Sequence, residues 1–311
     1  MTGHVPVMTR EVLAALNVRP GGRYVDGTVG AGGHAYAIME AAAPGGSLLG
    51  IDRDPAALER ARQRLEPFGD DVRLEQGSFG EMTQICEKYD YAPVHGVLLD
   101  LGLSSMQLEE AERGFSFQHE GPLDMRFDPS QELTAAEIVN EYDESEIADI
   151  IHGYGEEPKA RRIARRIVER RPLRTTADLA SVIEEAVGGR ARRQSHPATR
   201  TFQALRIAVN QELLSLDAAL PQAYGLLGDS GRLAVLSYHS LEDRRVKEFF
   251  SRESKDCICP PRQPACTCGH TATMRRVTRG AVRPSADEVD RNPRSRSARL
   301  RAAERLPTAS R

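Results

Sequence analysis

The sequence contains no long hydrophobic run. Its 311 residues are 40% hydrophobic and 28% charged, an ordinary composition for a folded chain of one or two domains. No segment approaches the roughly 20 consecutive apolar residues that a membrane-spanning helix needs. Residues 1–18 lack the apolar stretch of a secretory signal. We therefore expect a cytoplasmic protein that does not interact with membranes.

Lysine is also scarce, and positive charge is unevenly distributed. Only four of the 42 basic residues are lysines, and the formal net charge is −3. Residues 158–206 nevertheless hold 13 basic and 4 acidic side chains, and residues 275–305 hold 10 and 4, whereas residues 1–105 hold 9 and 14. Genome composition is enough to explain the preference for arginine. The clustering is typical of a surface that binds a polyanion such as RNA.

The hydrophobic pattern predicts strands that alternate with helices in the first hundred residues. Apolar segments predict strands at 23–25, 47–51, 72–75 and 95–99, with helices at 34–43 and 55–65. Helices are then predicted at 134–141, 144–152, 157–171, 176–187 and 196–214, before a strand signal returns at 232–238. Alternation of this kind indicates a doubly wound, mostly parallel α/β sheet with an inserted all-helical domain.

A glycine-rich turn follows the first predicted strand. Residues 26–34 read DGTVGAGGH, and glycines there let the backbone approach a ligand closely. Rossmann-like class I methyltransferases carry the pattern acidic-x-Gly-x-Gly-x-Gly at this place. Asp26, Gly30 and Gly32 match it, whereas Thr28 replaces the first glycine. The turn therefore predicts a binding site for S-adenosyl-L-methionine.

The same glycines have a second interpretation. Their spacing, with Asp52 about 20 residues further on, also fits the dinucleotide fingerprint of nicotinamide-dependent oxidoreductases. In either class, the Asp52 carboxylate can accept hydrogen bonds from ribose hydroxyls. Asp26 before the turn and Phe79 after the third strand, where methyltransferases hold the adenine, favour the methyltransferase.

The fourth predicted strand ends at Asp100, which we predict to be the catalytic residue. Amino-methyltransferases of DNA and RNA place an acidic or amide residue here, followed by Pro-Pro-aromatic, and use it to accept hydrogen bonds from an exocyclic amine. Residues 101–105 read LGLSS and lack the Pro-Pro-aromatic part. The motif alone therefore leaves the target atom open, and a carboxylate that only caps the loop is the alternative.

Eight segments together resemble one family, the RsmH (MraW) family of bacterial 16S rRNA cytosine-N4 methyltransferases. The segments occur in family order and spacing from residue 3 to about 304. They are GHVPVM (3–8), DGTVGAGGH (26–34), DLGLSSMQ (100–107), ERGFSF (112–117), GPLDMR (121–126), TFQALRIAVNQE (201–212), SYHSLEDR (237–244) and NPRSRS (292–297). Two departures are mild: Met106 replaces a common proline, and Tyr238 replaces a usual Phe.

The resemblance implies S-adenosylmethionine-dependent methylation of N4 of a cytidine in the decoding centre, near the P site, of 16S rRNA in the small ribosomal subunit. It implies cofactor contacts at Gly32, Gly33, His34, Asp52, Phe79, Asp100 and Gln107. A non-catalytic RNA-binding assembly factor with the same fold is the alternative outside enzymology. The oligomeric state, a dimer included, is left open, as is the choice between free rRNA and an assembled subunit.

The predicted domains follow from these boundaries. Residues 1–105 and 213–311 form the predicted methyltransferase domain, and residues 106–212 the predicted helical RNA-recognition domain. Beyond residue 280 the chain is polar and shows little periodicity, so we expect most of this tail to be extended or to become ordered on RNA. Candidate RNA contacts are Arg161, Arg162, Arg165, Arg166, Gln203, Arg206, Asn210, Tyr238 and His239.

Several candidates near these motifs have an equally simple structural interpretation. Ser240 is predicted to be the N-cap of a helix that begins at Leu241, with Asp243 at its third position. Phe115 and Phe117 lie in a glycine-rich loop and fit either base stacking or a loop core.

Cysteine is rare, and four of the five cysteines lie together. Cys257, Cys259, Cys266 and Cys268 form two C-x-C pairs with His270 close by. Four thiolates can hold a tetrahedral zinc ion, although C-x2-C is the usual spacing. Disulfides are not expected in a cytoplasmic protein. Reduced thiols in a proline-rich loop are the alternative, and Cys86 is interpreted as a core residue.

Overall fold

The computed structural model describes the whole chain except residues 1–5, 189–195, 262, 264 and 308–311. The first three residues of the GHVPVM segment, and the basic residues between 189 and 195, therefore lie outside the described residues. The chain divides into a sheet unit, Met1–Gly102 with Leu214–Arg311, and a helical unit, Leu103–Leu213. No helix within the described ranges is both long and apolar enough to cross a membrane.

The described residues of the sheet unit form one sheet of seven strands in the order β3-β2-β1-β4-β5-β7-β6. Its strands are β1 (Arg23–Asp26), β2 (Ser47–Asp52), β3 (Val72–Gln76), β4 (Val94–Asp100), β5 (Leu227–Ser237), β6 (Met274–Arg276) and β7 (Arg299–Arg305). The first five are parallel, while β7 runs antiparallel to both β5 and β6. The prediction of a doubly wound, mostly parallel α/β fold is confirmed.

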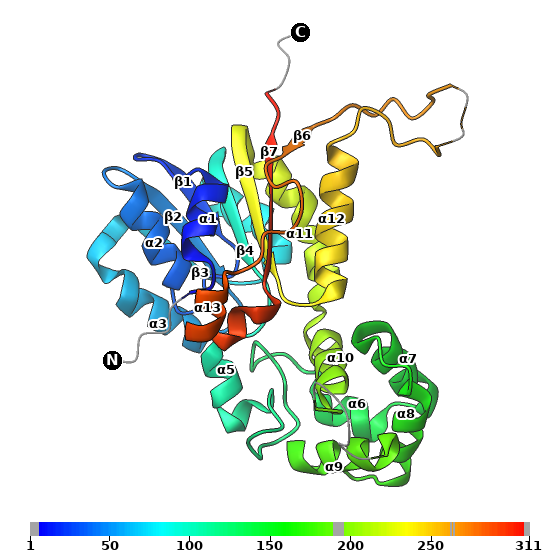
Figure 1. Cartoon of the computed structure of the whole chain (residues 1–311). Coiled ribbons are helices and arrows are strands. Elements are labelled where there is room, and N and C mark those ends of the chain that lie inside the picture. Colours follow the sequence, from blue (N-terminus) through cyan, green and yellow to red (C-terminus); the bar gives the residue numbers. More distant parts are fainter. Residues whose placement is uncertain (1–5, 189–195, 262, 264, 308–311) are drawn as a thin grey trace. The chain divides into compact units, whose positions relative to one another are not determined.

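Helices cover both faces of this sheet (Figure 1). The described α-helices of this unit are α1 (Thr9–Leu16), α2 (Gly33–Ala42), α3 (Pro55–Leu65), α4 (Met82–Lys88), α11 (Glu212–Leu226), α12 (Ser240–Glu253) and α13 (Ala286–Arg291). Successive strand residues point to opposite faces. Leu98 accordingly packs in the core with residues of α1, α2 and α3, and Leu99 in the core with residues of α4, α11 and α12. The predicted start of α3 is confirmed, because Asp54 accepts a hydrogen bond from the Ala56 amide at 3.0 Å.

The carboxy-terminal segment differs from the prediction. Instead of an extended tail, it forms α13 and then β7, in which Leu300, Ala302 and Ala303 are buried. The alternating arginines hid this strand in the sequence. Arg301 and Arg299 pair with Asp243 on α12, with shortest nitrogen–oxygen distances of 2.7 and 3.0 Å.

The helical unit has a core of its own. Its helices are α5 (Ser105–Glu109), α6 (Ala135–Glu141), α7 (Glu144–Gly155), α8 (Ala160–Glu169), α9 (Thr176–Val187) and α10 (Thr199–Asn210). Ile163 and Ile167 on α8 are buried with Phe202 of α10 in one cluster. The single helix predicted over 196–214 is wrong: the chain adopts a left-handed conformation at Gln211 (φ 51°), which ends α10 before α11 begins.

Candidate active site

The carboxyl ends of β1, β2 and β4 lie at one edge of the sheet because these strands are parallel neighbours. Asp26, Asp52 and Asp100 are the last residues of the three strands, and Asp26 is aligned with Leu98 of β4. The glycine-rich turn crosses this edge between β1 and α2. Gly30 and Gly32 have φ of 52° and 78°, conformations that favour glycine.

Asp52 organises this turn through backbone hydrogen bonds. Its Oδ2 accepts from the Gly30 amide at 2.8 Å, and its Oδ1 accepts from the Asp54 amide at 2.9 Å. Burial raises the pKa of Asp52 to about 6, although these amide donors oppose the shift. One carboxylate therefore fixes both the glycine turn and the entry to α3.

Asp26 lies beneath the turn and is almost fully buried, with 1% of its surface exposed. Burial raises its pKa to about 7, while the nearby His34 and the Thr28 amide act in the opposite direction. A side chain added at Gly30 would meet no atom closer than 3.9 Å. Buried carboxylates beside open space above a glycine backbone fit a ligand with a cationic group and hydroxyl donors, as S-adenosylmethionine has.

His34 and Tyr238 hold the Asp100 carboxylate from two sides. His34 Nδ1 lies 3.3 Å from Asp100 Oδ2, and the Tyr238 hydroxyl donates to Asp100 Oδ1 at 2.8 Å. The Asp100 amide donates to the Thr28 hydroxyl at 2.6 Å. Asp100 remains 24% exposed, so its carboxylate is oriented by neighbours and still accessible.

The partners of His34 determine its charge. Its second ring nitrogen, Nε2, lies 2.8 Å from the Val7 carbonyl. A carbonyl and a carboxylate only accept hydrogen bonds, so both ring nitrogens carry a proton when both bonds form. Burial disfavours the charged ring, but the Asp100 hydrogen bond and charge outweigh it, and the pKa of His34 is raised. We interpret the contact as an imidazolium paired with a carboxylate.

Thr28 has a role that the sequence did not reveal. It departs from the glycine pattern, and its hydroxyl links the turn to the end of β4 through the Asp100 amide. The departure itself was the available signal, because a hydroxyl at a position that usually holds glycine needs a partner. Gly33, at the first position of α2, places His34 on the same turn.

The remaining predicted cofactor contacts lie in different units. Phe79 begins a short 3₁₀ helix after β3, and its Cβ would lie 3.2 Å from a Cβ added at Gly27, so it borders the glycine turn. Gln107 belongs to the helical unit, where it is buried and forms a capping box with Ser104. Its contact with the cofactor stays a prediction.

In the part of the chain that the structure describes, two of the four predicted arginines of α8 form ion pairs with glutamates, and two do not. Arg166 contacts Glu185 and Glu169 at 2.9 Å, and Arg165 lies 3.7 Å from Glu144. Arg161 and Arg162 are exposed, and neither has an ion pair within the described residues. They line a hollow of about 490 Å³, together with Ala148, Asp149, His152, Pro158, Lys159 and Ala160.

The three predicted residues of α10 do not form an open polar face. Asn210 is buried, donates to the Met125 carbonyl at 2.7 Å and accepts from the Phe127 amide at 2.7 Å. Arg206 is paired with Glu212 at 2.8 Å. Gln203 donates to the Tyr154 carbonyl at 3.0 Å. These contacts hold the helical unit together and leave Asn210 no exposed surface for RNA.

The structure corrects one local expectation and decides between the two interpretations of another. The N-cap of α12 is His239 rather than Ser240, and Glu242 occupies the third position, with His239 Nε2 3.0 Å from Glu242 Oε1. Phe115 and Phe117 pack in the core of the helical unit, where Phe117 stacks on His196. Neither phenylalanine therefore serves as an open stacking platform within that unit.

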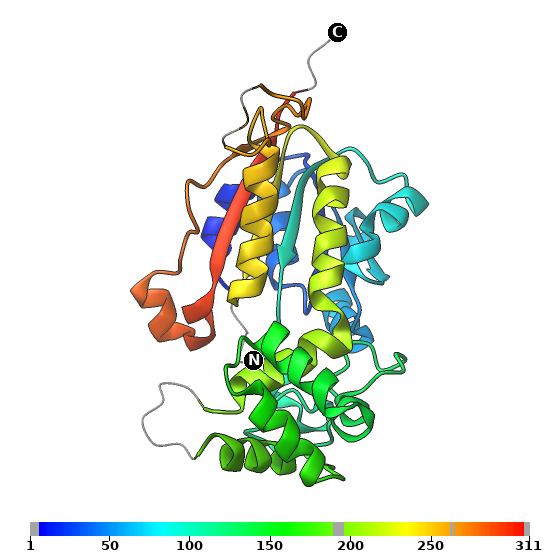
Figure 2. The same cartoon turned by 90° about the vertical axis from the view of Figure 1, so that its right-hand side faces the viewer.

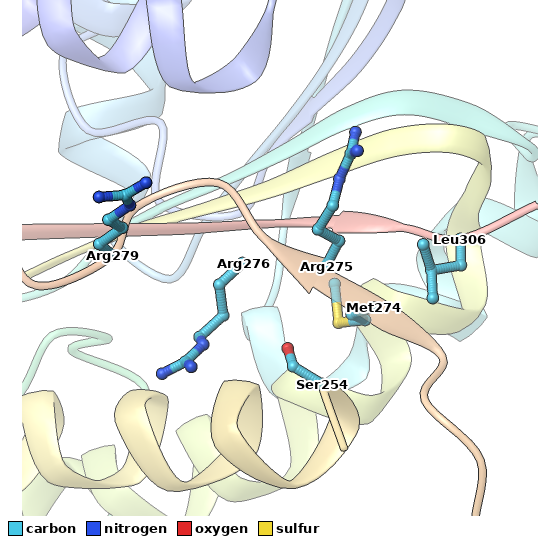
Figure 3. Close-up of a pocket in the computed structure, with 6 residues that line it drawn as sticks. All are labelled: Ser254, Met274, Arg275, Arg276, Arg279 and Leu306. Atoms are coloured by element: carbon cyan, nitrogen blue, oxygen red, sulfur yellow. The ribbon is translucent and has the colours of Figure 1, made fainter. Parts of the chain in front are cut away.

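Figure 3 shows a separate cavity of about 450 Å³ beside β6. It is lined by Ser254, Met274, Arg275, Arg276, Arg279 and Leu306. Met274 is aligned with Arg305 at the end of β7, whereas Arg299 at the other end is aligned with Ser237, near the strand ends that carry the three aspartates. The cavity thus lies at the opposite end of the strands from the three aspartates.

Comparison with known proteins decides between the remaining interpretations. Residues 1–306 match the family model described as the MraW methylase family. This chain belongs to the MraW methylase family. It is 59% identical over 303 residues to ribosomal RNA small subunit methyltransferase H of Dehalococcoides mccartyi, covering 97% of this chain and 86% of that protein. The protein of the same name from Thermomicrobium roseum is 53% identical, with 98% and 94% covered.

The structural comparison is more distant. An rRNA methylase from Streptococcus thermophilus superimposes with a TM-score of 0.43 at 12% identity, covering 98% of this chain and 99% of that one. The MraW membership confirms the expected family and a methyltransferase that uses S-adenosylmethionine. Neither the nicotinamide-dependent oxidoreductase nor the non-catalytic assembly factor is supported.

Proposed function

We propose that this chain methylates N4 of a cytidine in the decoding centre, near the P site, of 16S rRNA. The names of its relatives support small-subunit rRNA as the substrate. One observation carries the choice of an amine: Asp100 presents an oriented, partly exposed carboxylate at the end of β4. A carboxylate in that position suits a group that donates hydrogen bonds.

The chemistry follows from the weakness of the nucleophile. The lone pair of a cytosine amine is delocalised into the ring, so the nitrogen attacks poorly. Asp100 accepts a hydrogen bond from the amine, which draws the nitrogen toward tetrahedral geometry and aims its lone pair. Bound S-adenosylmethionine supplies an activated methyl group with a good leaving group.

His34 and Tyr238 act as positioning residues in this proposal. The charged His34 ring pairs with Asp100 Oδ2, while the Tyr238 hydroxyl fixes Oδ1. Each carboxylate oxygen has further lone-pair directions available for the amine. The pair therefore sets where the carboxylate points without contacting the reacting nitrogen.

The cofactor is assigned to the glycine turn and its carboxylates. Asp52 suits the ribose hydroxyls, Asp26 suits the positive charge of the methionine part, and Phe79 borders the site for the adenine. The turn supplies the backbone of Gly30, Gly32 and Gly33. The larger domain, residues 1–105 and 213–311, thus holds the cofactor, and the helical domain, residues 106–212, recognises RNA.

The experiment is mass mapping of methylated nucleosides in 16S rRNA from cells with and without this protein. We expect one N4-methylcytidine to disappear and to return on complementation. Fragment masses separate N4-methylcytidine from the C5 isomer, and loss of the C5 isomer instead would refute the assigned target atom. Transfer in vitro to free 16S rRNA and to assembled subunits identifies the form of the substrate.

A further inference from the structure

A long segment whose described residues form neither helix nor strand joins α12 to β6. The described residues of the range 254–273 lead away from the sheet, and they are coloured orange in Figures 1 and 2. Loops longer than about 12–15 residues without secondary structure are uncommon in compact domains. Ile258, the large apolar residue of the segment, is 45% exposed. Burial in a hydrophobic core therefore does not explain how this loop is held.

Hydrogen bonds close the base of the loop. The Thr273 amide donates to the Glu253 carbonyl at 2.8 Å, and the Ala272 amide donates to Asp256 at 3.2 Å. Figure 3 shows Ser254 at the end of α12 beside Met274 at the start of β6. The base is thus a defined structural element, and a second point of attachment is needed at the tip.

The four cysteine sulfurs meet at that tip. The Sγ–Sγ distances are 4.0 Å between Cys259 and Cys266, 3.5 Å between Cys266 and Cys268, and 3.9 Å between Cys268 and Cys257. All four sulfurs lie within 4.8 Å of one another. A tetrahedron of 2.3 Å zinc–sulfur bonds has edges of about 3.8 Å. Disulfide sulfurs are about 2.05 Å apart, so these distances do not describe disulfides.

Backbone amides point at the same sulfurs. The amides of Ile258 and His270 both donate to Cys268 Sγ at 3.5 Å, and the Thr267 amide donates to Cys259 Sγ at 3.5 Å. Hydrogen bonds to sulfur favour the thiolate, which is the form that binds a metal. Three amides of the loop are therefore directed at two of the four sulfurs, those of Cys259 and Cys268.

We propose that Cys257, Cys259, Cys266 and Cys268 bind one zinc ion that locks the loop at its tip. The fifth cysteine, Cys86, is buried in the core of the sheet unit and takes no part. His270 is not a ligand in this assignment, because the four cysteine sulfurs already make up a complete tetrahedral set. The zinc is structural, since four protein ligands leave no open coordination position. The site is independent of the proposed methyl transfer.

The test uses the full chain purified without chelator and measures zinc by elemental analysis. We expect about one zinc per chain. Cobalt substitution should give the thiolate charge-transfer absorption of a tetrahedral four-sulfur site. Replacing two ligands in a Cys257→Ser/Cys266→Ser variant should abolish both signals, and Cys257→Ser alone should weaken cobalt binding at least about tenfold.

His270→Ala is the matched control, because it alters the same loop without removing a sulfur. We expect this variant to retain its zinc. Zinc well below one equivalent in the unaltered chain, with no cobalt–thiolate absorption, would overturn the proposal even if the serine variants failed to fold. Loss of zinc in His270→Ala would overturn the four-cysteine ligand set.

Discussion

Replacement of Asp100 tests the proposed chemistry most directly. Asp100→Asn preserves the size of the side chain but removes its charge, and it turns an amide nitrogen toward either His34 or Tyr238. Both of these neighbours now donate to the carboxylate. The change therefore removes the negative charge, and the single amide oxygen that remains as an acceptor no longer has both donors to orient it.

These contacts determine how large the loss of kcat should be. Removal of one preorganised electrostatic contact to a transition state typically costs about 10²–10³ in kcat, or roughly 3–4 kcal/mol. We expect a loss of that size for Asp100→Asn and no detectable transfer for Asp100→Ala. The cost in folding stability should be smaller, about 2 kcal/mol, because Asp100 is one-quarter exposed and water screens its pairing with His34.

The assay is single-turnover methyl transfer to 16S rRNA, with calorimetry of S-adenosylhomocysteine binding and thermal melts in parallel. Tyr238→Phe is the matched control, since it removes one donor to Asp100 but leaves the carboxylate and the ion pair with His34. We expect the control to retain activity within about tenfold, in line with the net value of one hydrogen bond. Asp100→Asn turnover within about threefold of the unaltered enzyme would refute the assigned role, because the expected loss is far larger.

Three further predictions follow from named contacts. Asp26→Asn should flatten the fall in folding stability from pH 4 to 7. A buried carboxyl with a pKa of about 7 lowers folding stability by up to about 4 kcal/mol once it is ionised. Melting temperatures that change with pH in parallel for the two proteins would contradict this. The double variant Arg161→Ala/Arg162→Ala should lower the salt slope of RNA binding by about 0.7 for each phosphate that is no longer neutralised. Arg170 is already paired with Glu185, so Arg170→Ala should leave the slope unchanged. An unaltered slope in the double variant would argue against an RNA-binding surface on α8. Asn210→Ala should destabilise the helical unit by about 2 kcal/mol, because two buried backbone groups lose their partner; a fully stable variant in chemical denaturation would show that those hydrogen bonds contribute little.

The sequence was informative where a local pattern and a structural position coincide. Apolar segments that end in a carboxylate placed the ends of β1, β2 and β4 at Asp26, Asp52 and Asp100, because a buried strand needs apolar residues and the first charged residue marks where that segment stops. Pro55 after Asp54 likewise placed the start of α3 correctly. These features depend on neighbours in the chain and are therefore visible without a structure.

The features that the sequence did not predict depend on distant partners. Strand β7 carries arginines that look solvent-exposed until Asp243, more than 50 residues earlier, is seen to bind Arg301 and Arg299. The contact of His34 with Asp100 joins residues from α2 and β4. Polarity alone could not reveal that Asn210 is buried, because its partners come from a loop some 85 residues away.

One residue type performs different tasks at this sheet edge because its surroundings differ. Asp100 has a cationic partner in His34, whereas burial raises the pKa of Asp26 to about 7 and that of Asp52 to about 6. Folding stability therefore falls as pH rises toward these values, because the same carboxyl groups ionise at lower pH in the unfolded chain. The raised pKa of His34 acts in the same direction, because its pairing is lost as pH rises above its folded pKa. In the proposed cofactor site, the positive charge of S-adenosylmethionine would favour the ionised form of Asp26 and so offset this penalty. The ionised Asp26 carboxyl therefore destabilises the empty protein most at and above neutral pH. At the same pH, the proposed contact with a positively charged methyl donor would contribute most to binding.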